Sequence, residues 1–405
     1  MHAMTKQSLT SEDHFALLEQ YCAPNYAPLH VVLASGHGCW LTDVEGKRYL
    51  DMHAAYSGIN FGHSNERLLK VAHQQLDTLT LTSRAFVTDN LGLFCKELAE
   101  FCGMEMTLPM NSGAEAVETS IKLARRWGYE RKKVELNKAE VICFNDNFHG
   151  RTTTIISFSD AASSRTGYGP FTEGFPLVPY GDIEATRRAI TKNTVAILVE
   201  PIQGEAGIIM PPEGFLRDLR ALCTEHNILL MADEIQTGFC RTGARFACDH
   251  EQVRPDVYIL GKSLGGGIVP ISAVVASREL LSVFTPGTHG STFSGNPFAC
   301  AIAREVLRLI DEEKPELNSK NQGDYLLQRL EAAQFEKVEA VRGRGLFIGV
   351  DIKHEFGKAK RICEALKDKG ILCKDTRDYS IRIAPPLCVT RDEIDQALSV
   401  LSTVL

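Results

Sequence analysis

Short runs of apolar residues, each ending in a polar group, form the most regular pattern in the middle of this 405-residue chain. Residues 228–232 end at Asp233-Glu234, and Val257–Leu260 ends at Gly261-Lys262. Runs of this length with polar ends are typical of strands buried on both faces of a parallel sheet. Similar runs occupy Glu140–Phe144, Thr194–Val199 and Ser272–Ala276. Since helical segments separate most of these runs, the pattern predicts βαβ units and an α/β fold with a mostly parallel sheet.

The polar residues that end two of these runs, Asp233 and Lys262, are expected to lie close together. Parallel strands present their carboxyl ends, where open α/β sheets bind ligands, at one edge of the sheet. Pyridoxal phosphate requires a lysine for its Schiff base and a carboxylate beside its pyridine nitrogen, because a nearby negative charge keeps that nitrogen protonated. On these two residues alone, a turn aspartate and a loop lysine remain the commoner interpretation.

A helix is predicted to begin just after the turn Asn111-Ser112-Gly113. The apolar residues that follow have helical spacing, Ser112 suits the N-cap, and Glu115 would complete a capping box. Free N–H groups and the helix dipole at such an end can hold a phosphate. An ordinary capped helix without a ligand is the more frequent case.

Elsewhere the chain predicts a hairpin that turns at Glu45-Gly46, a helix over residues 66–79 and another over 301–311. From about residue 318 the pattern changes to a smaller α/β unit, and a domain boundary is predicted near residue 305. The N-terminal residues 1–20 are expected to form a helical or frayed lead-in.

Composition narrows the class of protein. The net charge of −7 and the absence of a basic block argue against nucleic-acid binding. No apolar run approaches the length of a membrane span, and the N-terminus has no secretory signal core. The twelve cysteines and twelve histidines show no metal-ligand spacing, so reduced thiols and no metal are expected. These features favour a cytoplasmic globular protein.

Six motifs then occur in order between Asn111 and Pro297: NSGAEAVE, NFHGRT, EPIQGEAG, ADEIQTGFCRTG, LGKSLGGG and HGSTFSGNP. Together they resemble the class III (ω-amino) aminotransferases of the pyridoxal-phosphate fold-type I family. The resemblance implies a large domain with a mostly parallel sheet and a smaller α/β domain built from both termini. The expected division is 1–56 for the N-terminal segment that joins the small domain, 57–305 for the large domain and 306–405 for the small domain.

The resemblance also implies pyridoxal 5'-phosphate as cofactor. Lys262 would form the Schiff base and later move the substrate proton, while Asp233 would pair with the pyridine nitrogen. The other implied contacts are the phosphate with Ser112, Gly113 and Ala114, the ring face with Phe148, the ring hydroxyl with Gln236, and the phosphate with Ser291 and Thr292 of a neighbouring subunit. The last pair implies a homodimer with shared active sites, with a higher oligomer left open.

Within the class, NYAPL, AAYSGIN, LTLTSRAF, GEAG and IRIAPPL resemble the ornithine aminotransferases, which use ornithine and 2-oxoglutarate. Arg151 and Arg382 would bind carboxylates, because a guanidinium matches a carboxylate with two hydrogen bonds. Tyr26 and Tyr56 would meet the far end of ornithine, and Glu205 would pair with Arg382. Taken singly, each of these residues is more often a surface or packing residue.

Two departures and several alternatives remain. His149 stands where some members have tryptophan, and Cys240 lies where a glycine is common. Neither removes a chemical role, although Cys240 near the cofactor could make the enzyme sensitive to oxidation. Acetylornithine and 4-aminobutyrate are alternative substrates, although Tyr56 argues against 4-aminobutyrate and Tyr26 less firmly against acetylornithine. A racemase or aminomutase on the same fold remains open because fold does not fix reaction. A non-catalytic binding protein is the weakest alternative.

Overall fold

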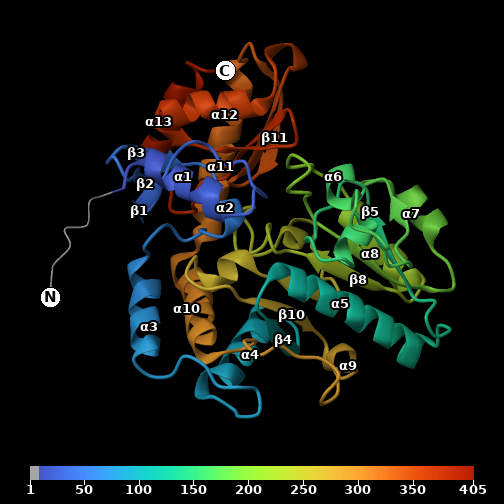
Figure 1. Ribbon diagram of the computed structural model, residues 1–405. Helices are drawn as coiled ribbons and strands as arrows, with labels where there is room; N and C mark the ends of the chain where they lie inside the picture. Colours follow the sequence, from blue (N-terminus) through green and yellow to red (C-terminus); the bar gives the residue numbers. More distant parts are fainter. Residues whose placement is uncertain (1–8) are drawn as a thin grey trace.

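The computed structural model describes residues 9–405, which form three sheets with helices around them (Figure 1). The largest sheet has seven strands and lies at the centre of the lower part of the molecule. In spatial order its strands are β4 (Met106–Met110), β10 (Ser272–Ala276), β9 (Val257–Leu260), β8 (Leu229–Asp233), β7 (Thr194–Val199), β5 (Glu140–Phe144) and β6 (Leu177–Val178).

The central strands of this sheet run parallel, from β9 through β8, β7 and β5 to β6. Only β10 is antiparallel to its neighbours β9 and β4. The prediction of a mostly parallel sheet is therefore confirmed. The predicted bounds of four strands are also correct, while β8 lies one residue later than the run 228–232.

Helices cover both faces of the large sheet, and the strand pleat decides which side chains meet which helix. On β5, Val141 and Cys143 pack in the cluster that contains α5 (Gly113–Trp127), whereas Ile142 and Phe144 pack with α8 (Phe215–Glu225). Because both faces are buried, most residues of these strands are apolar. The remaining helices of this part are α3 (Glu66–Leu76), α4 (Asp89–Phe101), α6 (Ala162–Arg165), α7 (Ile183–Ala189), α9 (Arg278–Leu281) and α10 (Pro297–Glu313).

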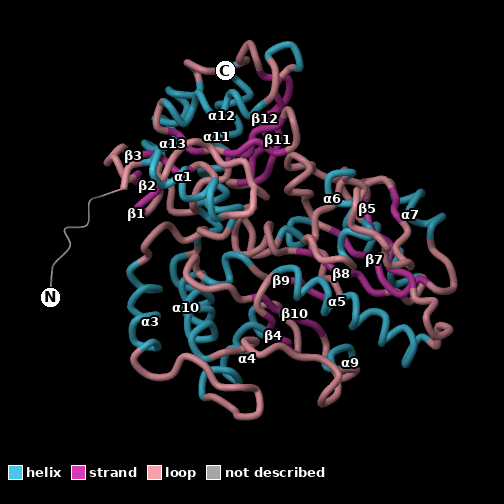
Figure 2. Tube along the Cα trace, in the orientation of Figure 1, coloured by secondary structure: helices cyan, strands magenta, loops and turns pink. Residues whose placement is uncertain are grey.

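Segments from the N-terminal and C-terminal parts of the chain pack together in the upper part of the molecule, where blue and red segments lie together in Figure 1. The β13 strand (Ile371–Leu372) pairs in parallel with β3 (Arg48–Asp51), which follows β1 (Leu33–His37) and β2 (Trp40–Asp43). A third sheet has the order β11 (Val338–Arg344), β12 (Phe347–Ile352), β15 (Ser380–Ile383) and β14 (Lys374–Thr376). Figure 2 shows the helices around these sheets: α1 (Ser11–Tyr21), α11 (Pro315–Ala333), α12 (Ala359–Asp368) and α13 (Arg391–Leu401).

The predicted domain boundary near residue 305 falls inside α10, which is longer at both ends than the predicted helix 301–311. The chain changes direction at Lys314, whose φ of 52° separates α10 from α11. The division into domains stays a prediction.

The buried side chain of Arg241 joins the lower and upper parts. Its guanidinium donates hydrogen bonds to the carbonyl oxygens of Leu346 (2.9 Å) and Pro385 (2.6 Å) and to Asn60 Oδ1 (2.5 Å). Burial lowers the Arg241 pKa to about 9, since no carboxylate pairs with it within residues 9–405. Replacing this residue would leave several carbonyl groups without a donor, which is costly in a buried position.

Candidate active site

Several chemically active side chains meet at the carboxyl edge of the large sheet, as the strand pattern predicts. They surround a cavity of about 150 Å³. Its wall includes six of the predicted cofactor residues: Gly113, Ala114, Phe148, Asp233, Gln236 and Lys262. The other lining residues are His149, Gly150, Glu200, Ile202, Ile235 and Thr237.

Lys262 lies two residues after the end of β9 and adopts a left-handed backbone conformation with φ 46°. This conformation is unfavourable for a side chain with a β-carbon and is often found at functional sites. Burial lowers the Lys262 pKa, although the charges of Glu205 and Asp233 oppose this effect. A lower pKa increases the fraction of neutral amine, the form that attacks a carbonyl carbon or accepts a proton.

Asp233 ends β8 and is almost fully buried, with two hydrogen-bond partners. Its Oδ1 accepts from the Ile235 N–H (3.1 Å), and its Oδ2 lies 2.6 Å from His149 Nδ1. Burial opposes the charged form of His149, but the hydrogen bond and charge of Asp233 outweigh burial and raise the His149 pKa. His149 therefore positions the Asp233 carboxylate. The observation that some family members have tryptophan at this position did not reveal that role.

Glu200 is a second carboxyl group in the cavity wall that the sequence analysis missed. It follows β7, and its oxygens accept from the N–H groups of Phe148 (2.9 Å) and Gly204 (3.2 Å). Burial raises the Glu200 pKa to about 7, even though the charge of His149 acts in the opposite direction. The same strand-end argument that identifies Asp233 would have identified Glu200.

The N-terminus of α5 forms one wall of the cavity and has the predicted capping box. Ser112 Oγ accepts from the Glu115 N–H (3.2 Å), and Glu115 Oε2 accepts from the Ser112 N–H (2.8 Å). Within residues 9–405, the N–H groups of Gly113 and Ala114 donate to no acceptor. Two free donors at the positive end of a 15-residue helix suit a phosphate group.

Gln236 links this cavity to a neighbouring charged cluster. Its Nε2 donates to Glu205 Oε1 (3.2 Å), while its buried Oε1 has no partner within the described chain. A β-carbon at Gly204 would lie 1.9 Å from that Oε1, so only glycine allows this approach. The vacant acceptor fits a hydroxyl donor on a bound molecule.

Arg382, Glu205 and Tyr56 form the charged cluster. Arg382, on β15, is almost fully buried, and its Nη2 donates to Glu205 Oε1 at 2.8 Å. The Arg382 guanidinium carbon lies 5.2 Å from the centre of the Tyr56 ring. Arg382 Nε and Nη1 are buried and have no acceptor within residues 9–405. This geometry agrees with the predicted Glu205–Arg382 pair and leaves two donors for another carboxylate.

A left-handed turn holds Tyr56 against Arg382. All four residues of α2 (Ala54–Ser57) have positive φ, between 45° and 71°, although none is glycine. Tyr56 also packs edge-on against His53, with ring centroids 4.2 Å apart. Burial of the Tyr56 side chain raises its pKa, so its hydroxyl keeps its proton and can donate.

The cavity wall does not include four other predicted site residues: Arg151, Tyr26, Ser291 and Thr292. Arg151 is exposed and lies over the Phe148 ring at 5.6 Å, with Nη1 3.3 Å from Ser164 Oγ. Tyr26, on an extended segment, is 80% exposed. Ser291 Oγ accepts from Asn111 Nδ2 of the same chain (2.7 Å), and the next residue, Thr292, is exposed. Their predicted roles stay predictions.

The expectation that Cys240 could make the enzyme sensitive to oxidation is wrong. Its side chain is fully buried, and burial together with nearby Glu316 raises the pKa of its thiol. A buried thiol with a raised pKa forms little thiolate and is unreactive. Proximity to a cofactor motif therefore does not make Cys240 a sensitive site.

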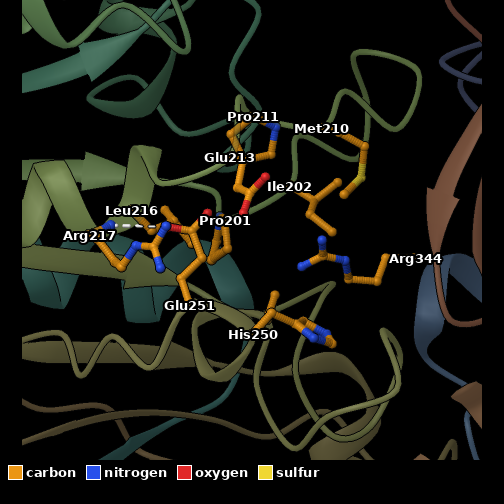
Figure 3. Close-up of a pocket in the computed structure, with 11 residues that line it drawn as sticks. Pro201, Ile202, Met210, Pro211, Glu213, Leu216, Arg217, His250, Glu251 and Arg344 are labelled. Atoms are coloured by element: carbon orange, nitrogen blue, oxygen red, sulfur yellow. Dashed lines mark hydrogen bonds between the residues drawn. The ribbon is translucent and has the colours of Figure 1, made fainter.

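A larger cavity of about 290 Å³ also has Ile202 in its wall, but neither Lys262 nor Asp233 lines it (Figure 3). Glu251, in its wall, accepts hydrogen bonds from the N–H groups of Gly214 and Arg217, both at 3.1 Å. Its carboxylate is thus occupied in fixing the start of α8. Across residues 9–405, no group of three His, Cys, Asp or Glu side chains could hold a metal ion, and no helix is both long and apolar enough to cross a bilayer.

Comparison with known proteins agrees with this geometry. The family model described as "Aminotransferase class-III" matches residues 21–405. The chain belongs to the class III aminotransferases. It is 52% identical to the ornithine aminotransferase of Staphylococcus carnosus over 388 residues, 96% of this chain and 97% of the relative.

Solved structures show the same class III architecture. The ornithine aminotransferase from Toxoplasma gondii, described with pyridoxal phosphate at its active site, has a TM-score of 0.97 and 41% identity, covering 98% of this chain and 94% of that one. The acetylornithine aminotransferase from Elizabethkingia anophelis has a TM-score of 0.89 and 40% identity, with coverage of 98% and 99%. The fold predicted from the resemblance is therefore confirmed.

Proposed function

We propose that this chain is a pyridoxal-phosphate-dependent ornithine δ-aminotransferase. It would transfer the terminal amino group of ornithine to 2-oxoglutarate, giving glutamate and glutamate 5-semialdehyde, which closes to pyrroline-5-carboxylate. The observation that carries the proposal is the buried Arg382 paired with Glu205 beside Tyr56 and the Lys262 cavity. The names of the relatives support the same choice.

The residues of the cavity fit pyridoxal phosphate. When bound, the cofactor supplies an electron-accepting ring that stabilises the charge left when a substrate C–H bond breaks. Gly113 and Ala114 would donate their N–H groups to its phosphate, and the Ser112 hydroxyl still has a proton to give. Gln236 would accept from the ring hydroxyl, and the Phe148 ring would cover one face.

Asp233 and Lys262 would carry the chemistry. The Asp233 carboxylate would favour a proton on the pyridine nitrogen, and the 2.6 Å contact with His149 holds that carboxylate in place. Lys262 would bind the cofactor covalently and then, as a neutral amine, carry the proton that leaves the substrate carbon. The lowered pKa of Lys262 supports that second role.

The Glu205–Arg382 pair would let one site react with two different amines. Ornithine must react at its terminal amine, away from its carboxylate, and this orientation is favoured when Glu205 neutralises Arg382. Arg151, Tyr26 and Tyr56 would then hold the far end of ornithine. In the second half-reaction, a carboxylate of 2-oxoglutarate would replace Glu205 on Arg382, where Nε and Nη1 are free to donate.

A homodimer with shared active sites is part of the proposal. Large apolar side chains are exposed from the end of α3 into α4 and on the loop before α10: Leu76, Leu79, Leu81, Phe86, Val87, Leu93 and Phe293. Exposed apolar patches of this kind mark protein interfaces. Thr292 lies beside Phe293, so a second copy that covers this patch could receive its hydroxyl. Light scattering should give twice the 44.7 kDa of the chain.

We also place the protein in the cytoplasm, because all twelve cysteines are free thiols. Acetylornithine aminotransferase is the competing function, favoured by the likeness to the Elizabethkingia anophelis structure. Tyr56 beside Arg382 argues for a substrate with a free polar end rather than for acetylornithine. The same residue argues more strongly against 4-aminobutyrate.

A screen of amino donors with 2-oxoglutarate tests the proposal directly. Ornithine, acetylornithine and 4-aminobutyrate would each be incubated with the holoenzyme, and pyrroline-5-carboxylate would be trapped as a coloured adduct. We expect product from ornithine only when the keto acid is present. Faster turnover of acetylornithine would overturn the substrate assignment, and turnover without the keto acid would indicate a racemase or aminomutase.

A further inference from the structure

Two cysteines from opposite ends of the chain lie in contact on the upper part of the molecule, outside the active site. Cys39 is in the turn between β1 and β2, and Cys388 is in the loop between β15 and α13. Their sulfur atoms are 3.6 Å apart. Cys39 is buried, whereas Cys388 is exposed and lines a cavity of about 450 Å³. This pair therefore combines a sulfur–sulfur contact with one thiol that solvent can reach.

Hydrogen bonds fix the backbone on both sides of this contact. Asn318 Nδ2 donates to the carbonyl oxygens of Leu387 (2.7 Å) and Val389 (3.0 Å), the two neighbours of Cys388. The Asp51 N–H donates to the carbonyl oxygen of Cys39 (2.8 Å). A disulfide requires a sulfur separation of about 2.05 Å. Bringing the sulfurs together from 3.6 Å therefore requires a shift of about 1.5 Å.

The two thiols differ in reactivity. The hydrogen bond from Cys39 lowers the pKa of the Cys388 thiol, while the same contact and burial raise the pKa of Cys39. A thiolate is the attacking species in disulfide exchange, and access to it is also required. Cys388 is the thiol that meets both conditions, and Cys39 is placed to react second.

We propose that Cys388 and Cys39 form a thiol-modification site for low-molecular-weight disulfides. The Cys388 thiolate attacks one sulfur of the small disulfide, forms a mixed disulfide and releases the first small thiolate. Cys39 then loses its proton and attacks Cys388 Sγ, which releases the second. In balance, two protein thiols are oxidised to one protein disulfide, and one small disulfide is reduced to two small thiols. The product ties the first hairpin to the loop that follows the Arg382 strand.

The chain contains its own controls. Cys363 and Cys373 also have sulfur atoms 3.6 Å apart, but both are buried and no oxidant can reach them. Cys22 is exposed, and no thiol within residues 9–405 contacts it, so it reports whether the oxidant has acted. The pair Cys39–Cys388 differs from both because it combines contact with exposure.

The test is to incubate the holoenzyme with oxidised glutathione, block remaining thiols and map peptides without reduction. We expect a Cys39–Cys388 crosslink, reversed by dithiothreitol, and glutathione on Cys22. In Cys39→Ser, glutathione should stay on Cys388, and in Cys388→Ser no crosslink should form. The crosslink should also raise the apparent unfolding temperature of the wild type by about 2–6 °C, because it closes a very long loop.

Two results would overturn the proposal. One is glutathione on Cys22 of the wild type with no Cys39–Cys388 crosslink, because the oxidant would then have reached the protein without effect at the pair. The other is a crosslink between Cys363 and Cys373 under the same conditions, since exposure would then not govern the reaction. Neither readout depends on aminotransferase activity.

Discussion

Removing the Glu205 carboxylate should change which amino acid reacts faster. Arg382 has a 2% exposed side chain, and its ion pair is the 2.8 Å contact with Glu205 Oε1. In Glu205→Ala the guanidinium would have no carboxylate to displace before it binds glutamate or 2-oxoglutarate. A hydrogen bond to a charged group contributes about 1.5–3 kcal/mol. We therefore expect the glutamate half-reaction to gain about ten- to a hundredfold over the ornithine half-reaction.

Single-turnover absorbance measurements on the cofactor would give both rates, and their ratio is the quantity to compare. Glu205→Gln is the matched control, because it keeps the side-chain volume and can still accept from Arg382 without carrying charge. It should shift the ratio in the same direction by a smaller factor. A partly unfolded variant would slow both half-reactions, so loss of stability alone would leave the ratio unchanged.

An unchanged ratio in Glu205→Ala would refute the reasoning, because Arg382 would then not be limited by its partner. A shift toward ornithine would refute it as well. Removing one member of a buried ion pair costs about 3–5 kcal/mol, and less where one partner is 29% exposed as Glu205 is. The unfolding temperature of the variant should therefore fall, and this measurement shows that the pair was present.

Three further changes test other parts of the site. In Lys262→Ala, borohydride should no longer fix the cofactor to the chain, and wild-type turnover would contradict the assignment. Asp233→Asn should keep the fold but lose about ten- to a hundredfold in turnover, because a neutral amide does not stabilise a protonated pyridine; near-normal turnover would exclude that role. Glu200 has a folded-state pKa of about 7 against the usual 4.5, so its contribution to stability is full below pH 4.5 and falls by about 3 kcal/mol as pH rises through 7. Cofactor-free Glu200→Gln should lack this decline between about pH 4.5 and 7, and parallel pH profiles of unfolding in the variant and the wild type would contradict the raised pKa of Glu200.

The main features of the fold could be predicted because burial on two faces leaves a direct pattern in the sequence. The run Thr194–Val199 is buried at every position and is apolar after its first residue, and Ser112 with Glu115 marks the start of α5. The direction of β10 could not be read in this way, since an antiparallel strand buried on both faces has the same composition. The two-residue strand β13 is too short to have a periodicity of its own.

Residues of the candidate site could be predicted where reactive side chains lie at or just after the end of a strand, and less so elsewhere. Asp233 and Lys262 follow that rule, and Glu200 would have been found if the rule had been applied to β7. The contact between His149 and Asp233 joins residues 84 positions apart, so only the folded chain shows it. Arg382 lies inside a strand rather than at its end, and only the family resemblance indicated a role for it.

The handedness of the turn at Ala54–Ser57 has a consequence for chemical synthesis. Residues of the L configuration pay about 1–2 kcal/mol each to adopt left-handed helical backbone angles. For the mirror-image amino acids the same angles are the relaxed ones. D-alanine at positions 54 and 55, introduced by segment ligation, should therefore fit this backbone better than the natural residues do, whereas in α5 or α10 it would break the helix.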